Sequence, residues 1–64
     1  MDSKYNGYKV TFENKQFPSY RATWEVANSE AERYFLNTGK EAKIYGFIGD
    51  SLRLIKTWRK APRT

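Results

Sequence analysis

The sequence predicts a small α+β domain in which one short helix packs on one face of an antiparallel four-stranded sheet, in the order ββαββ. Three observations support this fold class. Two segments of alternating apolar and polar residues lie within residues 8–26, a helix-capping pattern followed by a glycine covers residues 29–39, and a glycine turn joins two apolar segments within residues 41–58.

The first two strands are predicted from alternation. In residues 8–13, apolar side chains occupy every second position, which is the period of a half-buried strand. These apolar residues are Tyr8, Val10 and Phe12. Residues 14–19 are polar around one aromatic and contain a proline, which cannot donate a ladder hydrogen bond, so we expect a loop. Residues 20–26 alternate again and are predicted to form a second strand, antiparallel to the first, whose apolar side consists of Tyr20, Ala22, Trp24 and Val26.

The helix is predicted where the alternation stops. Ser29 and Glu32 fit a capping box, in which the serine oxygen accepts from a backbone amide of the first turn and the glutamate returns to the cap amide. We therefore expect a helix over about residues 30–37, ended by Gly39 in a left-handed conformation. The side chains expected to face the sheet are Ala31, Tyr34 and Phe35.

The last two strands are expected over residues 41–48 and 52–58, joined by a two-residue turn at Gly49 and Asp50. This turn would pair Phe47 with Leu52, Tyr45 with Leu54 and Lys43 with Lys56 on one face, and Ile44 with Ile55 and Gly46 with Arg53 on the other. A bulged turn would instead gather Ile44, Ile48, Leu52, Leu54 and Trp58 on one face. In either register one helix covers only one side, which leaves apolar surface for solvent, a second subunit or a ligand.

Length and composition limit the possible functions. A chain of 64 residues forms one domain, with an ordered core over about residues 5–60 and flexible tails at 1–4 and 61–64. Without cysteine or histidine, we expect no disulfide, no metal site, no cofactor and no His-based nucleophilic catalysis, so a non-enzymatic binding domain is predicted. Neither a signal peptide nor a membrane-spanning segment is evident, which favours a soluble cytoplasmic protein without membrane contact.

Two local patterns have structural explanations. Thr38, Gly39 and Lys40 resemble part of a phosphate-binding loop, but the rest of that motif is missing and a helix-capping glycine accounts for them. Glu13 and Glu25 would approach one another across the first hairpin, but both fall on the polar sides of their expected strands. We expect solvated carboxylates there rather than an acid–base pair.

The positive charge lies in the second half of the chain. The net charge is +5, and after Asp50 the sequence contains basic residues and no acidic ones. Between Lys40 and Arg63 the basic side chains are interleaved with Tyr45, Phe47 and Trp58, a combination that can neutralise phosphates and stack on unpaired bases. Trp58 is expected to belong to the core, and residues 1–39 to serve mainly as scaffold. The predicted nucleic-acid-binding residues are Lys40, Lys43, Tyr45, Phe47, Arg53, Lys56, Arg59, Lys60 and Arg63.

Nucleic acid is therefore the first partner that the sequence predicts, as single strands on the sheet surface or as a duplex whose major groove receives the last hairpin and Arg53. The alternative is a protein-binding module, such as a small phage-type inhibitor or adaptor that docks on a larger host protein. The apolar groups on both faces of the last hairpin support that alternative. A homodimer formed through the same hairpin is compatible with either function.

Overall fold

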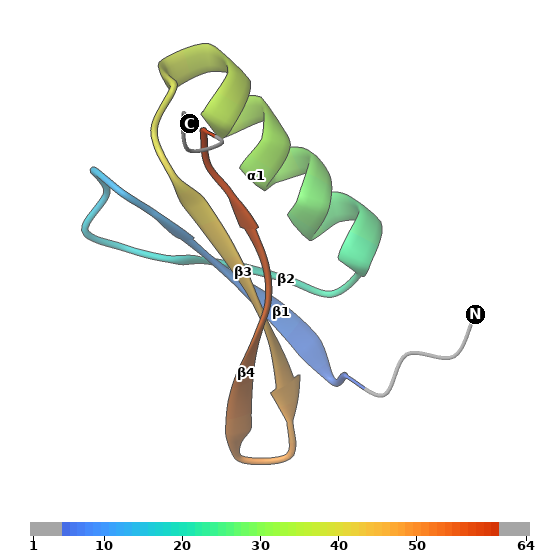
Figure 1. The fold of residues 1–64 in the computed structure, drawn as a ribbon. Coiled ribbons are helices and arrows are strands. Elements are labelled where there is room, and N and C mark those ends of the chain that lie inside the picture. The colour runs from blue at the N-terminus through green and yellow to red at the C-terminus, as the bar shows by residue number, and fades with distance from the viewer. Residues whose placement is uncertain (1–4, 61–64) are drawn as a thin grey trace.

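The computed structural model of the protein describes residues 5–60, which form one sheet and one helix (Figure 1). The elements are β1 (Gly7–Phe12), β2 (Ser19–Arg21), α1 (Trp24–Thr38), β3 (Ala42–Ile48) and β4 (Ser51–Trp58). The strands pair antiparallel in the order β2-β1-β3-β4, and α1 lies along one side of the sheet. The predicted α+β class and ββαββ order are confirmed. The tails predicted at residues 1–4 and 61–64 lie outside the described residues.

The core lies between α1 and the two central strands, β1 and β3. The alternation predicted for the first strand is confirmed, because its apolar side chains are buried against the helix while the residues between them are not. Val10 and Ile44 are the largest fully buried side chains, and burial of each contributes about 1.5–3 kcal/mol. Small residues on α1 let the helix approach the sheet closely. The buried hydrophobic residues are Tyr8, Val10, Phe12, Ala27, Ala31, Ala42 and Ile44.

The start of the helix differs from the prediction. A strand was expected over residues 20–26, but β2 ends at Arg21 and α1 begins at Trp24. Thr23 is the N-cap: its side chain accepts a hydrogen bond from the Val26 amide at 3.4 Å. Val26, expected on the buried side of a strand, is 50% exposed.

The physical reason is that Trp24 belongs to two patterns, since the alternation of the expected strand continues only as far as residue 26. Trp24, Ala27 and Ala31 also recur at the three-to-four-residue spacing of a helix, and this stripe packs on the sheet core. Burial of that stripe favours the longer helix. The capping box predicted at Ser29 is therefore wrong, since Ser29 lies inside α1.

The end of the helix agrees with the prediction. Gly39 has a φ of 74°, and its amide donates a hydrogen bond to the Phe35 carbonyl at 2.8 Å. The side chains expected to face the sheet do so: Ala31 is buried, the Tyr34 ring lies 4.7 Å from the Phe12 ring, and the Phe35 ring lies 6.0 Å from the Trp58 ring.

The β3–β4 hairpin has the predicted register only near its turn. The pairs Phe47–Leu52, Tyr45–Leu54 and Gly46–Arg53 are confirmed. A bulge then pairs Ile44 with Lys56 and Lys43 with Thr57, so the expected pairs Ile44–Ile55 and Lys43–Lys56 are wrong. The alternative with Ile44, Ile48, Leu52, Leu54 and Trp58 on one face is also wrong.

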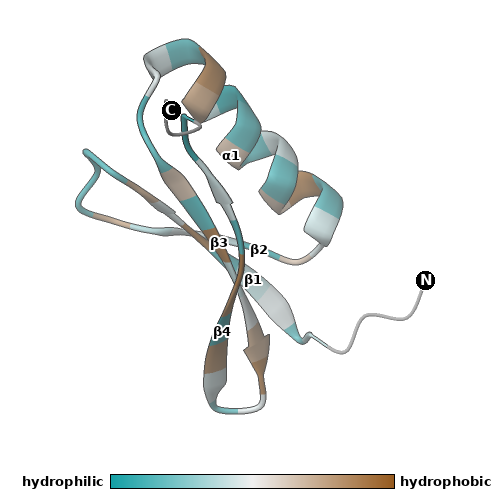
Figure 2. Ribbon diagram, in the orientation of Figure 1, coloured by the Kyte–Doolittle hydropathy of each residue, from teal (hydrophilic) through white to brown (hydrophobic). Residues whose placement is uncertain are grey.

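The bulge has a packing consequence. Ile55 and Trp58 are three positions apart, so an uninterrupted strand would direct them to opposite faces. With an extra residue in β4, both pack against the core on the helix side. Figure 2 shows further apolar residues on the part of the β3–β4 hairpin that extends away from α1.

Polar contacts attach the short strand β2 to the helix. Glu30 of α1 accepts hydrogen bonds from Arg21 Nε at 2.8 Å, Arg21 Nη2 at 3.2 Å and Ser19 Oγ at 2.9 Å. These bonds, led by that from Arg21, hold the pKa of Glu30 below its usual value of 4.5. Glu25 lies in the first turn of α1 instead of on a strand, so the expected approach of Glu13 and Glu25 across a hairpin is wrong.

No helix within residues 5–60 has the length and hydropathy needed to cross a membrane.

Candidate nucleic-acid interface

The side of the sheet that faces away from α1 is the candidate interface, and we call it the outer face. Because Val10 and Ile44 point to the helix, the residues that alternate with them in β1 and β3 point outward. Their registered partners in β2 and β4 share that direction. The outer face consists of Gly7, Lys9, Thr11, Tyr20, Lys43, Tyr45, Phe47, Leu52, Leu54 and Thr57.

A lysine stands at the centre of this face, among aromatic rings. Lys9 on β1 pairs with Tyr20 on β2 and with Tyr45 on β3, so a tyrosine flanks it on each side. Lys43 lies along β3, two positions from Tyr45, with its side chain 41% exposed and its Nζ 3.9 Å from Glu41 Oε1. At this distance and exposure the pair is weak, so Lys43 can exchange Glu41 for another anion.

Two of the outer-face rings form a stack. The centroids of Tyr20 and Phe47 are 6.1 Å apart and their planes differ by 25°. The two residues belong to strands on either side of β1, and Phe47 pairs with Gly7, where no side chain stands between the rings. Tyr20 remains 60% exposed. The Tyr20 ring of this stack is therefore open to solvent.

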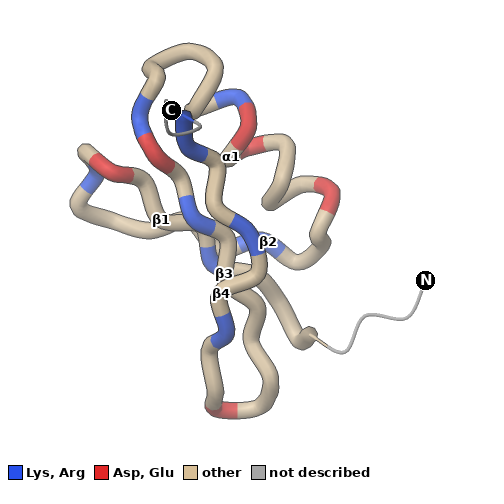
Figure 3. The backbone as a smooth tube through the Cα atoms, in the orientation of Figure 1, with Lys and Arg blue, Asp and Glu red and all other residues tan. Residues whose placement is uncertain are grey.

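Charge is divided between the sheet and the rest of the described chain. None of the four strands contains an acidic residue. The acidic residues of the described chain lie on α1 or in loops, as Figure 3 shows. The basic residues of the strands are Lys9, Arg21, Lys43, Arg53 and Lys56. The sheet is thus the cationic element of the fold.

The structure separates the residues that the sequence predicted as one site. Lys43, Tyr45 and Phe47 share the outer face. Arg53 pairs with Gly46 and Lys56 with Ile44, so both basic residues lie on the helix side of the sheet. A single surface containing all nine predicted residues is therefore wrong, because strand alternation and the bulge divide β4 between two faces.

The remaining predicted residues lie at or beyond the ends of the last hairpin strands. Lys40 precedes β3, while Arg59 and Lys60 follow β4, so these three lie at the open end of the hairpin. Arg63 lies outside the described residues.

Trp58 contacts the core, as expected. Its ring is partly buried, and its Nε1 donates a hydrogen bond to Asn28 Oδ1 of α1 at 3.0 Å. Lys56 Nζ lies 4.2 Å from the centre of the same ring. Trp58 and Lys56 are thus engaged with one another and with the helix side.

Two residues of the outer face come from the part of the chain expected to be scaffold. Lys9 was recognisable as a residue on the polar side of the first strand, but nothing local in the sequence shows that β1 lies between β2 and β3. Tyr20 was expected on the apolar side of a longer strand, together with Trp24. Because the strand ends at Arg21 and pairs Tyr20 with Lys9, its ring lies on the outer face instead.

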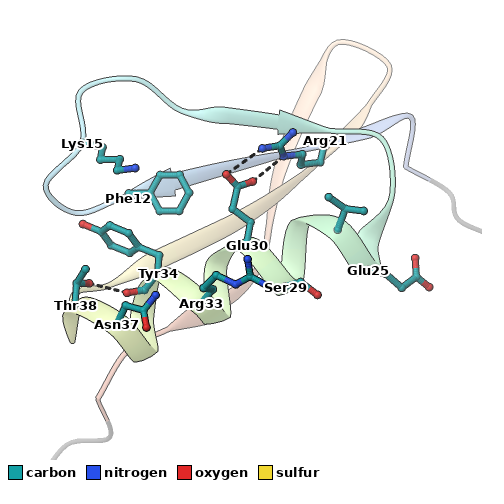
Figure 4. Close-up of a pocket in the computed structure, with 11 residues that line it drawn as sticks. Phe12, Lys15, Arg21, Glu25, Ser29, Glu30, Arg33, Tyr34, Asn37 and Thr38 are labelled. Carbon is teal, nitrogen blue, oxygen red and sulfur yellow. Dashed lines mark hydrogen bonds and ion pairs between the residues drawn. The ribbon is translucent and has the colours of Figure 1, made fainter.

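A second surface feature is an open groove of about 660 Å³ between α1 and the β1–β2 segment (Figure 4). Arg21 and Glu30 meet across it, and Lys15 lies near the ring of Phe12, with Nζ 5.2 Å from the ring centre. Its lining mixes acidic and basic side chains, so it has no field of one sign to attract a polyanion. The outer face is the stronger candidate for such a ligand.

No protein-family model matches the chain, and no curated protein or solved structure matches it either. Among residues 5–60, no three or more acidic side chains gather as a metal-binding group.

Proposed function

We propose that this protein is a non-enzymatic nucleic-acid-binding domain that contacts its ligand with the outer face of its sheet. The observation that supports the proposal is the coincidence, on the face opposite α1, of Lys9 and Lys43 with three aromatic residues, of which Tyr20 is 60% exposed, in strands without any acidic residue. Lysines on such a face neutralise backbone phosphates and release counterions, while the rings offer contact area for bases. A cytoplasmic location is part of this proposal.

A salt titration tests the proposal. Binding of a labelled mixed-sequence oligonucleotide is measured by fluorescence anisotropy at several salt concentrations. Each phosphate contact adds about 0.7–0.9 to the slope of log affinity against log salt, so the Lys9→Ala/Lys43→Ala variant is expected to lower the slope by roughly one to two.

A matched control removes the same charge elsewhere. Lys15 in the β1–β2 loop and Arg33 on α1 are both exposed and lie off the outer face. The Lys15→Ala/Arg33→Ala variant should keep the wild-type slope. Absence of binding by the wild-type protein at low salt would refute the proposal. An equal decrease of the salt slope in both variants would show that binding depends on net charge and not on the outer face.

A protein partner is the second candidate, and one observation favours it. Leu52 and Leu54 remain 42% and 49% exposed on β4, next to the aromatic residues of the outer face. A second copy of the chain or a larger protein would bury them. Sedimentation at two protein concentrations tests the homodimer. A mass that rises with concentration, and returns to the monomer value in the Leu52→Ser/Leu54→Ser variant, supports it, while a constant monomer mass rejects it.

A further inference from the structure

We infer that the ligand of the outer face is a single-stranded nucleic acid, whose unpaired bases stack on the Tyr20–Phe47 ring pair while Lys9 and Lys43 contact its phosphates. This inference rests on the proposed function and assigns the form of the nucleic acid and the role of each group.

The shape of the face favours a single strand. Strands in a sheet lie about 4.8 Å apart, so four strands span roughly 14 Å between the outer axes before side chains are added. The major groove of a duplex is about 12 Å wide and admits one helix or a two-stranded ribbon. Lys9 lies on the central strand β1, with β2 and β3 on either side, so the face around it is wider than the two-stranded ribbon that a major groove admits.

The hairpin also lacks what a groove-reading ribbon needs. Its closed end projects past the last β1–β3 pair, Gly7–Phe47, by only a few residues. Those residues include Ile48 and Asp50 but no basic side chain. Arg53, the candidate for reading bases in a groove, lies on the helix side, away from Tyr45 and Phe47. The duplex arrangement considered from the sequence would therefore present an acidic, apolar tip to phosphates.

The Tyr20–Phe47 ring pair suits the unpaired bases of a single strand. In a duplex, each base is already stacked on its neighbours, whereas an unpaired base exposes a face that a protein ring can cover. Tyr20 is 60% exposed and its ring lies within 25° of parallel to that of Phe47, so both rings already share an orientation on which a base can stack. Lys9 and Tyr45 lie directly beside the stack, where the sugar–phosphate backbone of a bound base would continue.

Three ligands and three variants test the inference. The ligands are a labelled single strand of mixed sequence, the same strand annealed to its complement, and an abasic strand with the same number of phosphates. The variants are Tyr20→Ala, Tyr20→Phe and, as a control off the outer face, Leu36→Ala, which truncates a side chain of α1 that is 68% exposed. Circular dichroism melting establishes that each variant is folded before affinities are compared.

We expect wild-type protein to prefer the intact single strand to both other ligands. Tyr20→Ala should weaken single-strand binding by between about fivefold and about 100-fold, the loss of one stacked base, and should leave abasic-strand binding unchanged. Tyr20→Phe and Leu36→Ala should bind as the wild type does. Equal or tighter binding of the duplex or the abasic strand overturns the inference but leaves the proposed function standing, whereas failure to bind any of the three ligands refutes both.

Discussion

Substitution of Gly46 by alanine tests how closely the chain packs on the helix side of β3. Gly46 is buried, and a methyl group built on it would lie 2.8 Å from Ile55 Cδ1 and 2.8 Å from Tyr5 Cε1. Carbon atoms at optimal contact are about 3.5–4.0 Å apart, so both neighbours would have to move. Gly46 is thus the place where Tyr5 and the bulged Ile55 cover the sheet.

The expected cost follows from two opposing effects. Overpacking of a close-packed site costs about 1–3 kcal/mol. Because Gly46 does not have a positive φ, alanine fits its backbone conformation, and the restricted unfolded chain then stabilises the fold by about 0.4–1 kcal/mol. With mid values of about 2 and 0.7 kcal/mol for these two effects, we expect Gly46→Ala to lower the free energy of unfolding by about 1.3 kcal/mol. For a domain of this size, each kcal/mol shifts Tm by about 4–8 °C.

The assay is urea denaturation followed by tryptophan fluorescence and circular dichroism, with Gly7→Ala as the matched control. Gly7 also lies in a central strand without a positive φ, but a methyl group there would approach only to 3.6 Å from the Arg21 carbonyl oxygen. Gly7→Ala should be neutral or slightly stabilising. In a Tyr5→Ala background the cost of Gly46→Ala should fall, with a coupling of about 0.5–3 kcal/mol. A Gly46→Ala protein as stable as the wild type, or one no less stable than Gly7→Ala, would refute this account of the packing.

Three further changes test the helix and its attachment. Thr23→Ala removes the N-cap and should lower the free energy of unfolding by about 0.5–1 kcal/mol in urea denaturation, at the low end because the capping hydrogen bond is 3.4 Å long. Ser29→Ala should leave that free energy almost unchanged. The reverse result would restore Ser29 as the cap of the helix. Gly39→Ala should lower stability by about 1–2 kcal/mol, because φ is 74°, and an unchanged melting temperature would contradict that conformation. Because the folded protein lowers the pKa of Glu30, the ionised carboxylate stabilises the fold above the unfolded pKa of 4.5, and this stability is lost as the pH falls through the folded pKa. When denaturation is measured at a series of pH values, the stability of Glu30→Gln should therefore decline less steeply in acid than that of the wild type. An equally steep decline would argue against the hydrogen bond from Arg21.

Several features of this protein are local properties of its sequence. The burial of one side of β1 follows from strict alternation, the end of α1 from Gly39, and the pairing of Phe47 with Leu52 from a two-residue turn. In each case the deciding residues are neighbours along the chain, and side-chain direction or backbone conformation depends only on them.

The helix start and the hairpin register were decided by tertiary packing. Residues 24–26 fit the alternation of a strand as well as the start of a helix, and the helix forms there because Ala27 and Ala31 then pack on β1 and β3. The bulge that separates Ile44 from Ile55 has a similar origin, since it lets Ile55 reach the core beside Trp58. Burial of distant apolar surface outweighs the small differences in local preference.

The candidate interface shows the same division. Lysines interleaved with aromatic residues along the second half of the chain predicted a basic and aromatic surface, and Lys43, Tyr45 and Phe47 do share one face. Only the order β2-β1-β3-β4 adds Lys9 and Tyr20 to that face. Strand order is set by which strands bury their apolar sides together under α1, a contact between distant parts of the chain that no local pattern records.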